Sequence, residues 1–165
     1  MSNSISFNYV ANNPVTFKDN RGSLNIIYES DTLVLKRSNS KKGVFRGLHY
    51  QSKDTPQNKI IRVIEGKILD FITDPKDRNE VVWYTEVGPE DNWIHINSGL
   101  AHGFYALNDV VFEYICDGGY SERNETTLSI QSLLNSTIGI KDLIMSPKDT
   151  AGKEFGKELR PYSSQ

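Results

Sequence analysis

The feature that most constrains the fold is a succession of short apolar-rich runs, each ended by turn-forming residues. From residue 59 onward the runs are KIIRVIE (59–65), KILDFITD (67–74), VVWYTEV (81–87), NWIHIN (92–97), HGFYAL (102–107), VVFEYIC (110–116) and TTLSIQ (126–131). Short alternating runs at a spacing of about ten residues are typical of an antiparallel sandwich or barrel. A chain of 165 residues has room for one sizeable core. The sequence therefore predicts a single all-β domain over residues 1–165.

Three local expectations accompany this fold. The runs on either side of Glu65 and Gly66 are expected to form a β-hairpin, because glycine supplies the positive φ of a tight turn. Helical periodicity is weak except from about Pro147 to Leu159, which predicts a short helical or irregular C-terminal segment. Alternation within VVFEYIC places Tyr114 on the inward apolar face. A tyrosine there is compatible with a purely structural core position.

Composition excludes several classes of protein. The 19 basic and 21 acidic residues nearly cancel, so nothing indicates a nucleic-acid partner. The first 14 residues lack the pattern of a signal peptide, and no apolar stretch approaches the roughly 20 residues that span a membrane. The single cysteine, Cys116, has no internal partner, which fits a reducing compartment. We therefore expect a cytoplasmic protein with no membrane partner.

Histidines and basic residues are the candidates for chemistry. The three histidines are His49, His95 and His102, each in or beside a predicted strand. Imidazole suits proton transfer near neutral pH, and three histidines are also compatible with a metal site. A lone histidine on a strand is more often structural, so position alone does not decide between these roles.

The segment KKGVFRGLHYQ (41–51) brings a guanidinium and an imidazole together, in Arg46 and His49. Lys59 begins the next run, and an antiparallel arrangement would bring its ammonium over the same cavity. Arg21 and the basic run that includes Lys36 would suit a diphosphate, although such runs are usually solvated surface.

These blocks are shared with a known family. FRGLHYQ (45–51), then Pro56, Gln57 and Lys59, then SGLAHGF (98–104) and FEYICDGGY (112–120), resemble the dTDP-4-dehydrorhamnose 3,5-epimerase family over about residues 17–150. The resemblance implies an antiparallel, cupin-type jelly roll that epimerises a nucleotide-diphosphate 4-keto-6-deoxy sugar for rhamnose-type deoxysugar biosynthesis. It also implies that no metal or other cofactor is needed, and that the protein is a homodimer with an exchanged N-terminal strand.

The resemblance further implies a role for each candidate residue. His49 matches the catalytic base, Asp149 the acidic partner of that base, and Tyr114 the general acid. Lys59 matches a lysine beside the ketone. The residues expected to bind substrate are Arg21 (from a neighbouring subunit), Arg46, Gln51, His102, Tyr120 and Lys36.

Residue chemistry agrees with these roles. A carbon beside a ketone loses a proton because the carbanion delocalises into the carbonyl, and a positioned base accelerates this step roughly 10²–10⁴-fold. A donor at the enolate oxygen adds about 3–4 kcal/mol. Inversion requires a proton from the opposite face, which a histidine and a tyrosine on either side of the ring would provide.

Some positions depart from the family pattern. The family's Gln-x-Asn-x-Ser reads Val34, Lys36 and Ser38 in this chain, and Lys36 with Arg37 is expected to take over phosphate contact. The tryptophan motifs near the family's C-terminus are missing from residues 130–145, which keep only Ile-Gly-Ile. The nucleotide, the sugar and the number of inverted carbons therefore remain open.

Other functions compete with this interpretation. A metal-dependent cupin needs His-x-His with a nearby glutamate, whereas Gln51 stands two residues after His49, and His95 and His102 are seven apart. A sugar-nucleotide 3,4-ketoisomerase would share the fold without the Arg-Gly-Leu-His block. A non-catalytic sugar-binding domain would use the same side chains for packing and surface contacts.

Overall fold

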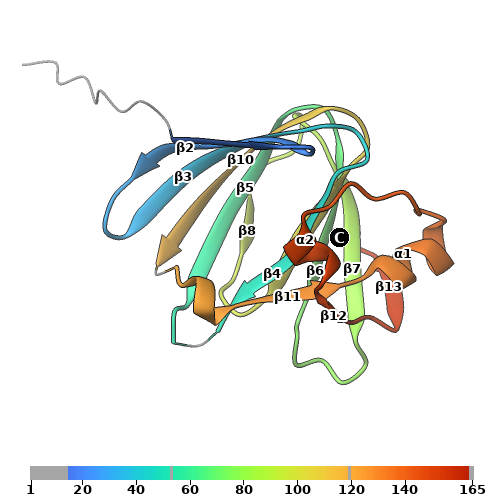
Figure 1. Cartoon of the computed structure of the whole chain (residues 1–165). Coiled ribbons are helices and arrows are strands. Elements are labelled where there is room, and N and C mark those ends of the chain that lie inside the picture. The colour runs from blue at the N-terminus through green and yellow to red at the C-terminus, as the bar shows by residue number, and fades with distance from the viewer. Residues whose placement is uncertain (1–14, 53, 119, 164–165) are drawn as a thin grey trace, which may run out of the picture.

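A computed structural model describes residues 15–52, 54–118 and 120–163. Residues 1–14 lie outside these ranges, so the part of the predicted N-terminal strand exchange that falls on them lies outside the described residues. The strands form two sheets that face each other, and the helices lie beside the second sheet (Figure 1).

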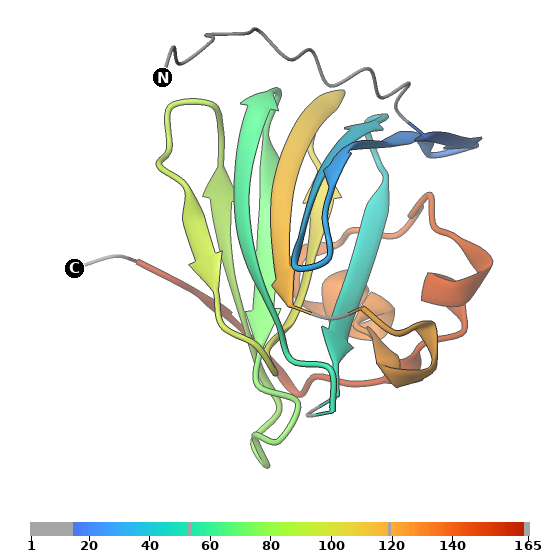
Figure 2. The same ribbon diagram turned by 90° about the vertical axis from the view of Figure 1, so that its left-hand side faces the viewer.

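The first sheet has six antiparallel strands within the described residues, in the order β1–β2–β3–β10–β5–β8. Figure 2 turns this sheet toward the viewer, with β5 and β10 at its centre. The strands are Val15–Asp19 (β1), Gly22–Glu29 (β2), Leu33–Ser40 (β3), Val110–Gly118 (β10), Gln57–Glu65 (β5) and Ile94–Ile96 (β8).

The second sheet has seven strands over the same described ranges, in the order β12–β11–β4–β9–β6–β7–β13. Its edge strands β12 and β13 run parallel to their neighbours, and the other pairs are antiparallel. The strands are Lys153–Glu154 (β12), Glu125–Ser129 (β11), Phe45–Gln51 (β4), Ala101–Ala106 (β9), Ile68–Thr73 (β6), Val81–Val87 (β7) and Glu158–Pro161 (β13). The all-β, cupin-like prediction is confirmed.

Two hydrophobic cores hold these layers together. One core lies between the sheets and includes Ile61, Phe104 and Phe112, each at most 3% exposed. The other lies on the outer face of the second sheet, where Leu134 packs with Phe71. Residues 130–159 therefore cover the outer face of the second sheet.

The connection at Gly66 is not the hairpin that the sequence predicts. β5 pairs with β10 and β8, whereas β6 pairs with β7 and β9, so the chain crosses from one sheet to the other at this turn. Gly66 has the expected positive φ of 81°. Because of this crossing, Ile61 of β5 and Ile68 of β6 face each other from opposite sheets and bury their side chains in the same core. In a hairpin the two strands would lie side by side in one sheet.

The C-terminal segment, predicted to be helical or irregular, contains one short helix and two short strands. Within 147–159 the α-helix is α2, Pro147–Thr150, and strands β12 and β13 follow it. The longer helix α1, Gln131–Ile138, lies upstream; it buries Leu133 and Leu134 and ends at Gly139 in the left-handed conformation. A single 3₁₀ turn, Glu122–Asn124, precedes β11. No helix in the described ranges is both long and apolar enough to cross a membrane.

Candidate active site

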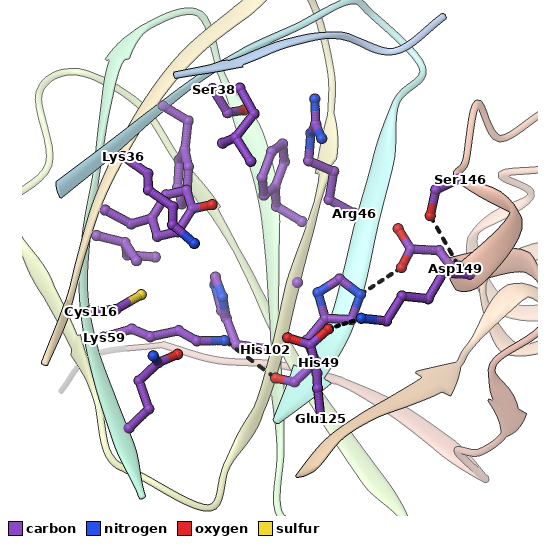
Figure 3. A pocket seen from close by; sticks show the side chains of 18 of the residues that line it. Lys36, Ser38, Arg46, His49, Lys59, His102, Cys116, Glu125, Ser146 and Asp149 are labelled. Carbon is purple, nitrogen blue, oxygen red and sulfur yellow. Dashed lines mark hydrogen bonds and ion pairs between the residues drawn. The ribbon is translucent and has the colours of Figure 1, made fainter. Parts of the chain in front are cut away.

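A cavity of about 400 Å³ lies between the two sheets and receives side chains from both. In Figure 3, His49 and Asp149 lie on one side, and Lys36, Cys116 and Lys59 on the other. Nine of the ten predicted site residues line this cavity: Arg21, Lys36, Arg46, His49, Lys59, His102, Tyr114, Tyr120 and Asp149.

An irregularity in β4 delivers both Arg46 and His49 to the cavity. Residues three apart on a regular strand point to opposite faces, but the pairing of β4 with β9 shifts register between these two residues. Gly47 and Gly103 allow the close approach of the two backbones at this point. A Cβ on Gly103 would lie 2.4 Å from the carbonyl oxygen of Arg46.

The imidazole of His49 is held by a buried carboxylate. Its Nε2 lies 2.5 Å from Oδ1 of Asp149, which is fully buried in α2. The backbone N–H of Gly47 donates to Oδ2 at 3.4 Å, and the Arg21 guanidinium lies 3.7 Å from that oxygen. Burial alone would raise the pKa of Asp149, but its bond to His49, the Gly47 N–H and Arg21 hold that pKa below its ordinary value. The ionised Asp149 accepts a hydrogen bond from Nε2–H of His49, which leaves Nδ1 as the basic nitrogen of the neutral ring.

Two proton-bearing groups come from the first sheet. Tyr114 lies on the inward face of β10, as predicted, and burial raises its pKa above the ordinary value, so the phenol keeps its proton near neutral pH. Lys59, on the neighbouring strand β5, donates from Nζ to the backbone oxygen of His49 at 3.4 Å. Burial lowers the pKa of Lys59. The predicted return of Lys59 to the cavity of His49 is thus present in the structure.

Sequence analysis missed a second histidine–carboxylate pair. Nε2 of His102 lies 2.6 Å from Oδ1 of Asp70, and both residues are buried. The signal was present in KILDFITD, where alternation places Asp70 on the same face as Ile68 and Ile72. An ionisable residue on an inward apolar face needs a partner, and His102 is that partner.

An ion pair at the cavity wall was also missed. Lys148 and Glu125 both line the cavity, and Nζ of Lys148 contacts Oε1 of Glu125. Figure 3 shows Glu125 of this pair beside His49. Lys148 precedes Asp149 in the segment MSPKD (145–149), and both residues lie in α2. The position of this helix therefore determines where both side chains begin.

Two predicted contacts lie elsewhere. Gln51 is buried outside the cavity, where its side-chain oxygen accepts from the hydroxyl of Thr55 at 2.9 Å and from the N–H of Ser121 at 3.3 Å. The side-chain oxygen of Gln51 therefore links the loop that holds Thr55 to the loop that holds Ser121. Arg37 lies on the outer face of the first sheet in an ion pair with Glu113, because it is offset by one residue from the inward Lys36.

The three histidines do not converge on one point. His95 is exposed and pairs in register with Ile60 on the first sheet, whereas His49 and His102 are register partners on β4 and β9. Each of the latter two bonds its own carboxylate. The described residues contain no group of three or more metal-ligand side chains placed to hold an ion.

Comparison with known proteins identifies the family. The model of the dTDP-4-dehydrorhamnose 3,5-epimerase family matches residues 8–157. The enzyme of that name from Neisseria gonorrhoeae is 32% identical over 151 residues, which are 86% of this chain and 43% of that protein. The chain therefore spans less than half the length of this relative.

Solved structures agree in fold. The crystal structure of dTDP-4-dehydrorhamnose 3,5-epimerase from Sulfolobus tokodaii has a TM-score of 0.63 at 33% identity, over 84% of this chain and 85% of that one. The dTDP-6-deoxy-D-glucose-3,5-epimerase of Legionella pneumophila, in complex with dTDP-4-keto-L-rhamnose, has a TM-score of 0.62 at 28% identity, over 86% and 84%.

A cupin-type sandwich matched along most of its length by these proteins defines a carbohydrate epimerase. More narrowly, the chain belongs to the dTDP-4-dehydrorhamnose 3,5-epimerase family. The predicted fold and family are confirmed, and the roles of individual side chains stay predictions.

Proposed function

We propose that this protein inverts carbons 3 and 5 of a dTDP-linked 4-keto-6-deoxy sugar, as a step of deoxysugar biosynthesis. The observation that most supports this proposal is the content of the cavity. A histidine held by a buried carboxylate enters from one sheet, and a protonated phenol and a lysine enter from the other. A sugar ring between these walls would have a base on one side and an acid on the other.

His49 takes the first proton. Asp149 fixes the ring and favours the imidazolium that forms when Nδ1 accepts the proton from the carbon beside the ketone. The C–H electron pair moves into the ring carbon–carbon bond, and negative charge develops on the ketone oxygen. Because Asp149 is fully buried, water does not compete for this contact.

Lys59 stabilises the enolate oxygen, and His102 helps to position the sugar. Lys59 Nζ already lies in the cavity beside the backbone of His49, and an ammonium there offsets the developing charge. His102 lies on the opposite wall, where the carboxylate of Asp70 holds its imidazole. Lys59 comes from the first sheet and His102 from the second, so a sugar in the cavity would contact both walls.

Tyr114 returns a proton from the other side of the ring. Its phenol holds the proton near neutral pH because burial raises its pKa, yet the enolate carbon is basic enough to take it. The new C–H bond then points to the opposite face, and the centre is inverted. Inversion at one carbon or at both uses these same groups.

The diphosphate and the nucleotide's aromatic base would occupy the rim of the cavity. Arg21 and Lys148 present positive charge near Asp149, and Arg46 adds a third cation. Tyr120 is 54% exposed at the rim and offers a flat ring on which a base can stack.

The test is solvent exchange in heavy water. We expect deuterium at carbons 3 and 5 when the protein is incubated with dTDP-4-keto-6-deoxyglucose, followed by NMR. Incorporation at one carbon alone would limit the proposal to a single inversion. Absence of exchange at every carbon would overturn it.

Variants assign the steps. His49→Asn is expected to abolish exchange. His95→Asn, at an exposed position on β8 of the first sheet, is the matched control and should exchange at the native rate. Tyr114→Phe is expected to retain exchange but to slow inversion. If Tyr114→Phe inverts the sugar at the native rate, another group is the acid.

We also propose that the protein is a homodimer, on the strength of the family resemblance. Within one chain, the β1–β2 hairpin pairs with its own β3 and carries Arg21 to Asp149. Light scattering measures the mass directly, and a monomeric mass at micromolar concentration would contradict the proposal.

A further inference from the structure

Lys36 is a cation of the cavity, and no anionic side chain among the described residues pairs with it. It donates no hydrogen bond and forms no ion pair with any residue that the structure describes. The other cavity cations do have such partners: Arg21 with Asp19, Lys148 with Glu125, Arg46 with Ser40, and Lys59 with the backbone oxygen of His49.

Two tyrosine rings lie near the ammonium of Lys36 instead. Nζ of Lys36 lies 5.9 Å from the ring centroid of Tyr114 and 5.5 Å from that of Tyr120. The register of β3 and β10 pairs Lys36 directly with Tyr114, and both side chains point inward. The contact is thus a cross-strand pair fixed by the sheet. In Figure 3, Lys36 reaches into the cavity from the side that also carries Lys59.

The positive charge of Lys36 departs from the pattern of the family that this chain resembles. The family's Gln-x-Asn-x-Ser segment reads Val34, Lys36 and Ser38, so an ammonium stands where the pattern has a neutral amide. The neighbouring Arg37 points to the opposite face and pairs with Glu113. Lys36 alone of this basic pair acts on the cavity.

We propose that Lys36 is a positioning residue for Tyr114, and that its ammonium stabilises the phenolate left when Tyr114 gives up its proton. In that step the O–H bond of Tyr114 breaks and the enolate electron pair forms the new C–H bond. The ketone re-forms, and water later returns a proton to the phenolate. The inference rests on the proposed function.

Other groups around the phenol define what Lys36 must do. Burial raises the pKa of Tyr114 most strongly; Cys116 of β10, Glu125 of β11 and Tyr120 act in the same direction, whereas Arg46 of β4 lowers it. A phenolate in this cavity is therefore disfavoured unless cations face it. Lys36 provides one from the adjacent strand, and a neighbouring opposite charge shifts a pKa by about one to three units.

Kinetics separate this role from substrate binding. In Lys36→Met we expect exchange of the first proton to stay near the native rate, while inversion slows about 10-fold. Lys36→Arg, which keeps the charge, is expected to recover most of the inversion rate. The control is Lys41→Met, an exposed lysine just after β3.

Two kinetic outcomes overturn the proposal. Equal loss of exchange and inversion, with weaker binding of dTDP, would make Lys36 a substrate-binding group only. Native rates of both steps in Lys36→Met would leave Lys36 without a role in proton return.

A second measurement needs no substrate. With 3-fluorotyrosine replacing tyrosine, the phenols titrate at lower pH and are followed by ¹⁹F NMR, and Tyr114→Phe assigns the resonance of position 114. We expect a higher phenol pKa at position 114 in Lys36→Met than in the parent. An unchanged pKa would contradict the inference even if the protein epimerises sugars. Failure of every 4-keto sugar to react would instead refute the proposed function, and this titration would still decide the role of Lys36.

Discussion

At the residue scale, the carboxylate of Asp149 shows how a buried charge is maintained. Its pKa in the folded protein lies below the ordinary value of 3.8, because the His49, Gly47 and Arg21 contacts outweigh burial. A carboxylate whose pKa is lowered by folding stabilises the fold above its unfolded-state pKa. This stabilisation is lost as the pH falls through the lower folded-state pKa.

We therefore expect the free energy of unfolding to fall as the pH drops below about 4, and to fall less steeply in Asp149→Asn. Urea unfolding at a series of pH values measures both slopes. Asp142→Asn, which alters an exposed carboxylate in the preceding loop, is the control. Identical acid slopes in the wild type and Asp149→Asn would show that the partners of Asp149 do not lower its pKa.

The second histidine–carboxylate pair gives another prediction at this scale. Asp70→Asn weakens the contact that holds His102, so we expect solvent exchange at the sugar to slow about 10-fold, which is less than the roughly 10²–10⁴-fold that a positioned acid or base itself contributes. Deuterium incorporation measures the effect. Asp74→Asn, an exposed position at the end of the same run, is the comparison. Native exchange in Asp70→Asn would show that fixing the His102 ring does not matter for proton removal.

At the scale of elements, the irregular pairing of β4 with β9 determines where the base lies. Gly103→Ala would place a Cβ 2.4 Å from the Arg46 carbonyl oxygen and 3.0 Å from the Cα of Gly47. We expect a loss of about 1–3 kcal/mol in the free energy of unfolding, because backbone atoms must move apart.

Denaturant unfolding checks this value. Gly88→Ala is the matched control, since its new Cβ would meet only the carboxylate end of the exposed Glu90 side chain, which can swing away. Equal stability of the two variants would mean that β4 and β9 tolerate separation at this point.

Strand faces were predictable from the sequence, whereas strand partners were not. Alternation is a local property, so it correctly turned Tyr114 inward. The pairing across Gly66 was wrong, because a turn glycine fits equally well between strands of one sheet and between strands of two sheets.

At the scale of the whole molecule, the C-terminal segment is a cover that also carries part of the candidate site. α1 packs on the outer face of the second sheet, and α2 extends the same cover to Asp149 beside His49. The stability of this cover should therefore depend on α1.

Leu134→Ala is expected to lower the free energy of unfolding by about 2–5 kcal/mol, because Leu134 is fully buried in this outer core. Thermal or denaturant unfolding measures the loss, with Ser132→Ala on the exposed side of α1 as the control. A loss no larger than that of the control would mean that α1 is dispensable.

The sequence by itself determined the all-β class, the family and the inward direction of Tyr114, because short-range alternation and contiguous blocks such as FRGLHYQ carry that information. The family blocks also pointed to His49, Lys59 and Asp149. The tertiary structure alone decided that Gln51 lies away from the cavity, and that Asp70 supports His102. The physical reason is that side chains far apart along the chain meet only through sheet pairing and register, which depend on the packing of the whole molecule.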